Sequence, residues 1–129
     1  MVSCNADDAG QILTISYGRR VNSSQVEECL RSIERMGHLQ RGFVLLSDLT
    51  QLESMDEDCA TPLGAIMELC SSRGISAIVR VIPDPSKDIG FNLIALFHFQ
   101  KPVRTYTCPN LAEAMKYLLA EFPPTTAEP

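Results

Sequence analysis

The residues that could act together in this 129-residue chain are acids gathered in one short stretch. Glu53, Asp56, Glu57 and Asp58 lie in a polar turn over 50–58 that contains no lysine or arginine. Negative charge is stabilised where the amide groups and dipole of a helix begin. Two interpretations are open: the turn is a recognition site, or its acids are ordinary helix caps.

A strand and a helix are expected on either side of this turn. The apolar run 43–46 is too short for a helix and predicts a buried strand. From about Cys59 apolar residues recur at helical spacing, and Gly74 stands where a glycine would end the helix. Thr61-Pro62 is a second candidate for the helix start. The turn therefore connects a buried strand to a helix.

No motif of catalysis or of cofactor binding is present. The chain has no phosphate-binding loop, no glycine-rich dinucleotide fingerprint and no Gly-x-Ser-x-Gly elbow. His38 and His98 have no identifiable partner for general acid–base work. The five cysteines are scattered, without the close pairs that zinc or a disulfide framework would need. We expect no cofactor and no metal, and an enzyme is the least supported class.

Composition and charge limit the classes of partner. A net charge of −5 argues against a nucleic-acid binder, which needs a basic face. The longest apolar run, 89–99, is too short to cross a bilayer. The first ten residues lack the basic and apolar regions of a secretory signal. We expect a cytoplasmic protein with no membrane span.

The remaining segments alternate between strand and helix patterns. Strands are predicted at 12–17, 75–82 and 103–107, and helices at about 24–36, 87–99 and 111–122. Such alternation predicts an α/β fold: a single domain with a mostly parallel sheet of four to five strands and about four helices. We expect residues 1–10 to be flexible or a short edge strand, 11–122 to form the domain, and 123–129 to be a disordered tail.

For the first and last helices the sequence also predicts the capping residues and, for the last, the buried face. Ser24 with Glu27 has the spacing of a capping box at the first helix, and Asn110 with Glu113 has it at the last. The apolar residues of the last helix are expected to face the core. They are Leu111, Met115, Leu118, Leu119 and Phe122.

The helix predicted at 87–99 has more apolar residues than one face can hold. A sheet covers about one face of a helix, so the surplus indicates another subunit or an internal pocket. We expect this surface to form a symmetric homodimer, with a small-molecule or lipid pocket as the alternative. Its apolar residues are Ile89, Phe91, Leu93, Ile94, Leu96, Phe97 and Phe99, of which Phe91, Leu93, Phe97 and Phe99 are the candidate site.

The motif order resembles that of the STAS domain family, which includes bacterial anti-sigma-factor antagonists and cytoplasmic domains of sulfate transporters. ILTISYGRRVNSSQVEECLRSI is similar to the family's strand, turn and first helix, and Asp48-Leu49-Thr50 to its Asp-Leu-Ser. Residues 56–59 fall where the family has Asp-Ser-Ser-Gly, and VRTYTCPNLAEAMKYL is similar to its last strand and helix. The resemblance covers about 11–119 and implies a STAS-like (SpoIIAA-like) topology.

The chain departs from this family at the phospho-acceptor. The family's second serine receives phosphate from a partner kinase, and here Asp58 stands in its place, after Glu57 and before Cys59. A carboxylate cannot form the same phosphoester, but it imitates part of the charge of a phosphoserine. A receiver-type phospho-acceptor fold is disfavoured, because Asp7-Asp8 precede the first strand and no lysine stands directly after the last strand at Thr107.

The sequence therefore predicts a non-catalytic interaction domain of STAS type. It would dock a protein partner through the acidic turn and the start of the second helix. The expected partner-binding residues are Asp48, Thr50, Asp56, Glu57, Asp58 and Cys59. The resemblance implies an anti-sigma factor or a kinase-like regulator as the partner. The rival function is a small-molecule or lipid binder of the same fold.

Overall fold

The structure is a computed structural model that describes residues 1–83 and 103–121. Its centre is a five-stranded sheet in the order β1-β2-β4-β6-β7. The strands are β1 (Val2–Ala6), β2 (Ile12–Tyr17), β4 (Val44–Asp48), β6 (Ala77–Val81) and β7 (Arg104–Cys108). The edge strand β1 is antiparallel to β2, and the other neighbours are parallel. The prediction of a mostly parallel sheet is confirmed.

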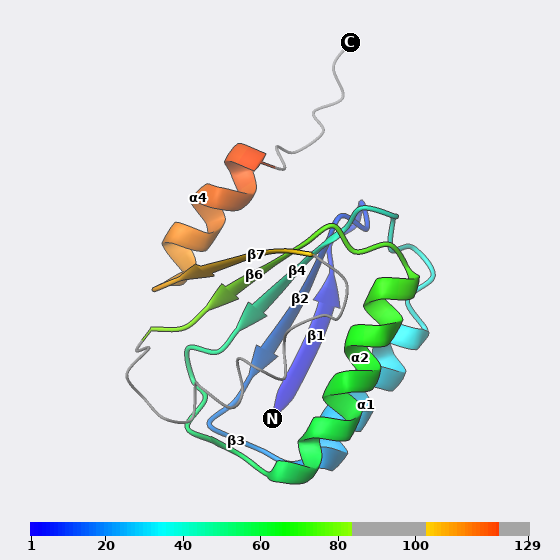
Figure 1. Cartoon of the computed structure of the whole chain (residues 1–129), viewed down its shortest axis with the longest axis vertical. Coiled ribbons are helices and arrows are strands. Elements are labelled where there is room, and N and C mark those ends of the chain that lie inside the picture. Colours follow the sequence, from blue (N-terminus) through cyan, green and yellow to red (C-terminus); the bar gives the residue numbers. More distant parts are fainter. Residues whose placement is uncertain (84–102, 122–129) are drawn as a thin grey trace.

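Helices cover both faces of the sheet (Figure 1). α1 (Ser23–Glu34) and α2 (Ala60–Ser72) pack side by side on one face, and α4 (Leu111–Glu121) lies on the other. The structure thus shows three α-helices in its described residues. The fourth predicted helix, with Phe91, Leu93, Phe97 and Phe99, lies outside them. The homodimer and the apolar pocket expected there remain predictions.

The larger core lies between the sheet and the pair α1 and α2. Alternate residues of β2, among them Leu13, Ile15 and Tyr17, point into it and are almost fully buried. Helix α1 contributes a stripe of buried residues from Val26 to Ile33, and α2 contributes buried residues from Pro62 to Cys70. The burial of alternate strand residues against two amphipathic helices is the main stabilising term of such a layered domain.

The smaller core lies under α4. Val44 and Leu46 of β4 and Val79 of β6 point to this face, so the two central strands are buried on both sides. This arrangement explains their nearly continuous apolar sequences, as expected for central parallel strands. Ala114 and Leu118 are the buried contacts of α4.

The predicted inward face of α4 is wrong in three of its described residues. Leu111, Met115 and Leu119 are exposed by 41%, 46% and 57%. Two overlapping apolar stripes run along this helix, and the helix packs through the stripe containing Ala114 and Leu118. The small Ala114 side chain permits close approach to the sheet, which helical periodicity alone does not reveal.

The ends of α1 and α2 are defined by local chemistry. Asn22, and not Ser24, forms the capping box of α1: its side chain accepts from the Gln25 amide at 3.0 Å, and the Gln25 side chain accepts from the Asn22 amide at 3.1 Å. The predicted Ser24 and Glu27 pair is therefore shifted by two residues. Gly74 follows α2 with a φ of +88°, a left-handed conformation that suits glycine, as predicted.

Candidate functional site

The acidic turn begins where β4 ends. The Asp48 carboxylate accepts hydrogen bonds from the backbone amide of Thr50 at 3.0 Å and from its hydroxyl at 2.7 Å. The chain then passes through a two-residue strand, β5 (Ser54–Met55), and a single 3-10 turn, η1 (Glu57–Cys59), into α2. Asp48 and Thr50 are half-buried, and their hydrogen-bonding groups pair with each other. This pairing fixes the start of the turn.

A small parallel pairing holds the turn to the chain that follows β2. β3 (Arg20–Val21) pairs with β5. The Arg19 carbonyl accepts from the amides of Glu53 and Ser54 at 2.8 and 3.0 Å, and the Val21 carbonyl accepts from the Asp56 amide at 3.1 Å. The backbone on both sides of the acids is therefore fixed against a second segment of the chain.

The four acids of the turn are all exposed, as their charge predicts. Glu53 forms an ion pair with Arg19, with 2.7 Å between nitrogen and oxygen. Asp58 accepts a hydrogen bond from the Ser23 hydroxyl at 3.2 Å. Asp56 makes no side-chain capping bond to η1, although it holds the cap position. A side-chain capping bond thus does not account for Asp56.

Cys59 differs from its neighbours because its side chain is fully buried. Its thiol lies 3.8 Å from the Val21 carbonyl, to which it donates. Burial raises the pKa of the Cys59 thiol, and the charges of Asp58 and Asp56 raise it further. The expectation that Cys59 binds a partner directly is wrong on this geometry. Its side chain instead anchors the start of α2 to the core.

The start of α1 lies beside this turn, because Ser23 is the first residue of α1 and bonds Asp58. Sequence reasoning missed Arg19 and Ser23 as neighbours of the acids. No local signal joins them to the turn, since the contacts span 34 and 35 positions in the sequence.

Mutation of Asn22 tests directly whether its capping box stabilises the start of α1. Asn22→Ala should lower the free energy of unfolding by about 1 kcal/mol, because an amide at the start of α1 loses its acceptor. Urea unfolding followed by circular dichroism measures it. Ser24→Ala is the matched control and should change stability by less than about 0.5 kcal/mol. A larger loss for Ser24→Ala than for Asn22→Ala would contradict the assignment.

Two solved structures resemble this fold over nearly the whole chain. An uncharacterised protein of the DUF3478 family from Shewanella loihica, with a SpoIIAA-like fold, matches with a TM-score of 0.61 and 12% identity, over 92% of each chain. The anti-sigma factor antagonist SpoIIAA in its unphosphorylated form matches with a TM-score of 0.60 and 16% identity, over 92% of this chain and 97% of that one. The chain has a SpoIIAA-like, STAS-like fold.

Within this SpoIIAA-like fold the acidic turn joins the central strand β4 to α2. No protein-family model and no curated protein matches the sequence. In residues 1–83 and 103–121, no helix is long and apolar enough to cross a membrane. The same residues contain no cluster of three or more histidine, cysteine or acidic side chains that could hold a metal ion.

Proposed function

We propose that this STAS-like domain is a non-catalytic regulatory module that docks a protein partner through its acidic turn and the start of α2. The observation that carries the proposal is the set of three consecutive exposed acids, Asp56, Glu57 and Asp58, on a backbone held by β3 and β5. Fixed charges lose little conformational freedom on binding, so they suit recognition of a basic partner surface.

The second support is the likeness to an anti-sigma factor antagonist. By that likeness, the partner class is an anti-sigma factor or a kinase-like regulator. Asp58 has a permanent negative charge where the resemblance places a phospho-acceptor serine. We propose that the turn is constitutively charged and is not switched by a kinase at this position. We place the domain in the cytoplasm, where its five free thiols would stay reduced.

Neutralising the turn should weaken partner binding. The variant Asp56→Asn with Glu57→Gln removes two exposed charges without touching the Ser23–Asp58 bond. We expect the Kd of a partner recovered by pull-down to rise at least about tenfold, equivalent to about 1.4 kcal/mol. The loss should shrink in high salt, because exposed charges are screened. Isothermal titration at two salt concentrations measures both effects.

The matched control is Glu27→Gln with Glu34→Gln, two exposed acids of α1 outside the turn. This variant has the same net charge as the turn variant. It should bind the partner with unchanged affinity. Equal losses in the two variants would show that only overall charge matters, and unchanged binding in the turn variant would refute the proposed docking site.

A further inference from the structure

The edge strand β1 lacks the features that usually prevent a sheet edge from pairing with another chain. Its sequence, VSCNA, contains no charged residue and no proline, and its pairing with β2 runs without a bulge from Val2 to Ala6. Edge strands are commonly protected by charges, proline or bulges, because their outward backbone groups bind another strand readily. Within residues 1–83 and 103–121, β2 is the one strand that pairs with β1. The outer edge of β1 is therefore open to a further strand.

The backbone groups that face this open edge belong to Val2, Cys4 and Ala6. The Asp7 amide donates to the Ile12 carbonyl at 3.1 Å, so residue 7 bonds toward the β2 side. In an antiparallel pair, every second residue exchanges its hydrogen bonds with the neighbouring strand, and the residues between direct theirs to the other side. Odd-numbered residues of β1 therefore bond to β2, and the three even-numbered residues direct their N–H and C=O groups outward.

These outward groups are self-complementary about one position, Cys4. When two copies of β1 pair antiparallel with a two-fold axis at Cys4, Val2 of each copy lies opposite Ala6 of the other. The two Cys4 residues then lie opposite each other, and all three outward residues exchange both backbone hydrogen bonds with the second copy. A shift of the axis by one residue in either direction leaves Val2 or Ala6 without a partner in the opposing strand. The backbone therefore favours the register centred on Cys4.

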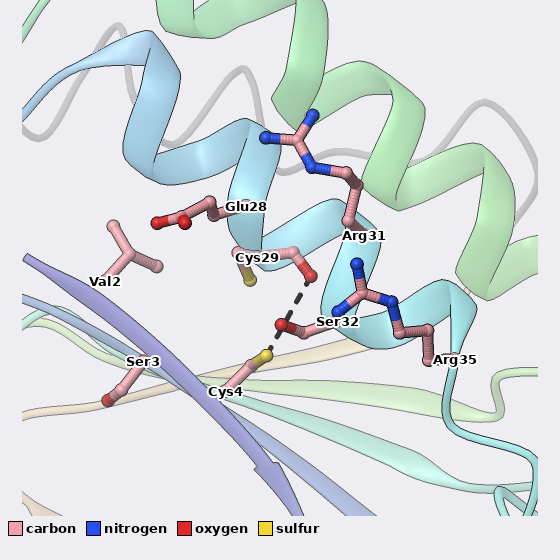
Figure 2. A pocket seen from close by; sticks show the side chains of 8 residues that line it. All are labelled: Val2, Ser3, Cys4, Glu28, Cys29, Arg31, Ser32 and Arg35. Atoms are coloured by element: carbon pink, nitrogen blue, oxygen red, sulfur yellow. Dashed lines mark hydrogen bonds between the residues drawn. The ribbon is translucent and has the colours of Figure 1, made fainter.

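Helix α1 carries opposite charges that are arranged about the same position. Glu28 and Arg35 are exposed, lie about two helical turns apart, and line a groove of about 330 Å³ between α1 and β1 (Figure 2). Neither side chain forms an ion pair within the part of the chain that the structure describes. The midpoint between them falls at Arg31 and Ser32, and Figure 2 shows the Ser32 hydroxyl beside the Cys4 thiol. The centre of the charge pattern thus lies level with the centre of the strand.

We infer that β1 and α1 form a two-fold interface between two copies of this chain. Strand β1 of each copy extends the sheet of the other, and the two α1 helices run antiparallel across the axis. Glu28 of each copy then faces Arg35 of the other, and the closed symmetry leaves no edge free for further growth on this side. Arg31 is close to the axis in sequence, but Figure 2 shows its side chain directed away from β1, which separates the two like charges. This interface involves neither the acidic turn nor the surface predicted at 87–99.

A second copy fits this edge better than an unrelated extended peptide does. Any extended segment can satisfy the outward backbone groups, because strand addition depends on main-chain hydrogen bonds. Such a segment must also supply a cation for Glu28 and an anion for Arg35 at the correct spacing along the groove. A second copy supplies both charges by symmetry, in the register that the backbone already favours. Complementary charges of this kind fix the register of an interface more than they add affinity.

The first test measures self-association of the full-length chain by sedimentation velocity over a range of concentrations. We expect a monomer–dimer equilibrium whose Kd rises at least about tenfold in Cys4→Pro. Proline at this position removes the central outward N–H but no bond to β2, and edge strands tolerate proline where the nitrogen faces outward. Circular dichroism checks that this variant is folded, and Asn5→Ala, whose side chain lies on the other face of the sheet, is the control. A wild-type protein that stays monomeric up to about 1 mM overturns the proposal.

The second test uses two charge reversals that leave the backbone unchanged. Glu28→Arg and Arg35→Glu should each weaken self-association severalfold, because each places like charges opposite each other across the axis. An equimolar mixture of the two variants should form heterodimers with nearly wild-type affinity, since opposite charges then meet at both contacts. Glu27→Arg is the control, because Glu27 is exposed on α1 but does not line the groove. No heterodimer in the mixture, or an equal loss in the control, refutes the antiparallel contact of α1 with α1.

The third test locates the interface by amide hydrogen exchange, followed by NMR at a low and a high protein concentration. The amides of Cys4 and Ala6 should exchange fast in the monomer and at least about tenfold more slowly in the dimer, because only the second copy gives them acceptors. The amides of Ser3 and Asn5, which bond to β2, should be protected at both concentrations. Fast exchange of Cys4 and Ala6 in a dimeric sample would place the interface elsewhere and overturn the proposal. Protection that appears only when an extended peptide is added to a monomeric protein would also overturn it.

Discussion

Phe43→Ala should lower the free energy of unfolding by about 3–5 kcal/mol, the largest loss we expect from any single substitution in the described residues. Phe43 is the largest of the fully buried side chains, with 1% of its surface exposed. Its carbonyl accepts from the Ser76 amide at 2.9 Å and its amide donates to the Gln40 carbonyl at 3.1 Å. The backbone is thus tied on two sides and cannot collapse into the cavity. Urea unfolding measures the loss.

Phe43→Leu is the matched control. It preserves most of the apolar volume and should cost less than about 1.5 kcal/mol. Leu119→Ala, on the exposed stripe of α4, should change stability by less than about 0.5 kcal/mol. A loss below about 1 kcal/mol for Phe43→Ala would mean that this end of β4 repacks freely, against the hydrogen bonds described.

The mostly parallel sheet was predictable because its signals are local and repeated. The alternation in ILTISY matches β2 at both ends. The nearly continuous apolar sequences of β4 and β6 reflect burial on both faces, which parallel central strands require. A parallel connection also needs a covering helix, so alternating strand and helix patterns limit the topology strongly.

Choices between equivalent local signals were not predictable. Asn22, Ser23 and Ser24 are all good caps, and the box at Asn22 depends on where α1 meets the sheet. Helix α4 has two apolar stripes, and only its contact with the sheet selects Ala114 and Leu118. Tertiary contacts therefore decide between alternatives that are nearly equal in local free energy.

The candidate site, too, was predictable only in part. Exposure of the acids was predictable, because three consecutive carboxylates cannot be buried cheaply. The burial of Cys59 and the bonds from Arg19 and Ser23 were not, because each depends on a segment more than 30 positions away. The pairing of β3 with β5 involves two residues on each side, too few to leave a periodic pattern.

Arg73→Ala should have the second largest effect, a loss of about 2–3 kcal/mol in the free energy of unfolding. The Arg73 guanidinium, at the end of α2, donates to the carbonyls of Ile33 and Met36 at 2.9 and 2.7 Å and of Glu34 at 2.8 Å. These carbonyls lie at the C-terminal end of α1, where a cation is also favoured by the helix dipole. Thermal and urea unfolding would both show the loss.

The result should depend on geometry as well as on charge. Arg73→Lys preserves the charge but cannot reach three carbonyls from one planar group, so it should recover less than half of the loss. Arg35→Ala, an exposed arginine at the C-cap of α1, is the control and should cost less than about 0.5 kcal/mol. Full recovery by Arg73→Lys would show that the dipole alone is responsible. Partial recovery would show that the forked hydrogen bonds, and not charge alone, join the C-terminal ends of α1 and α2.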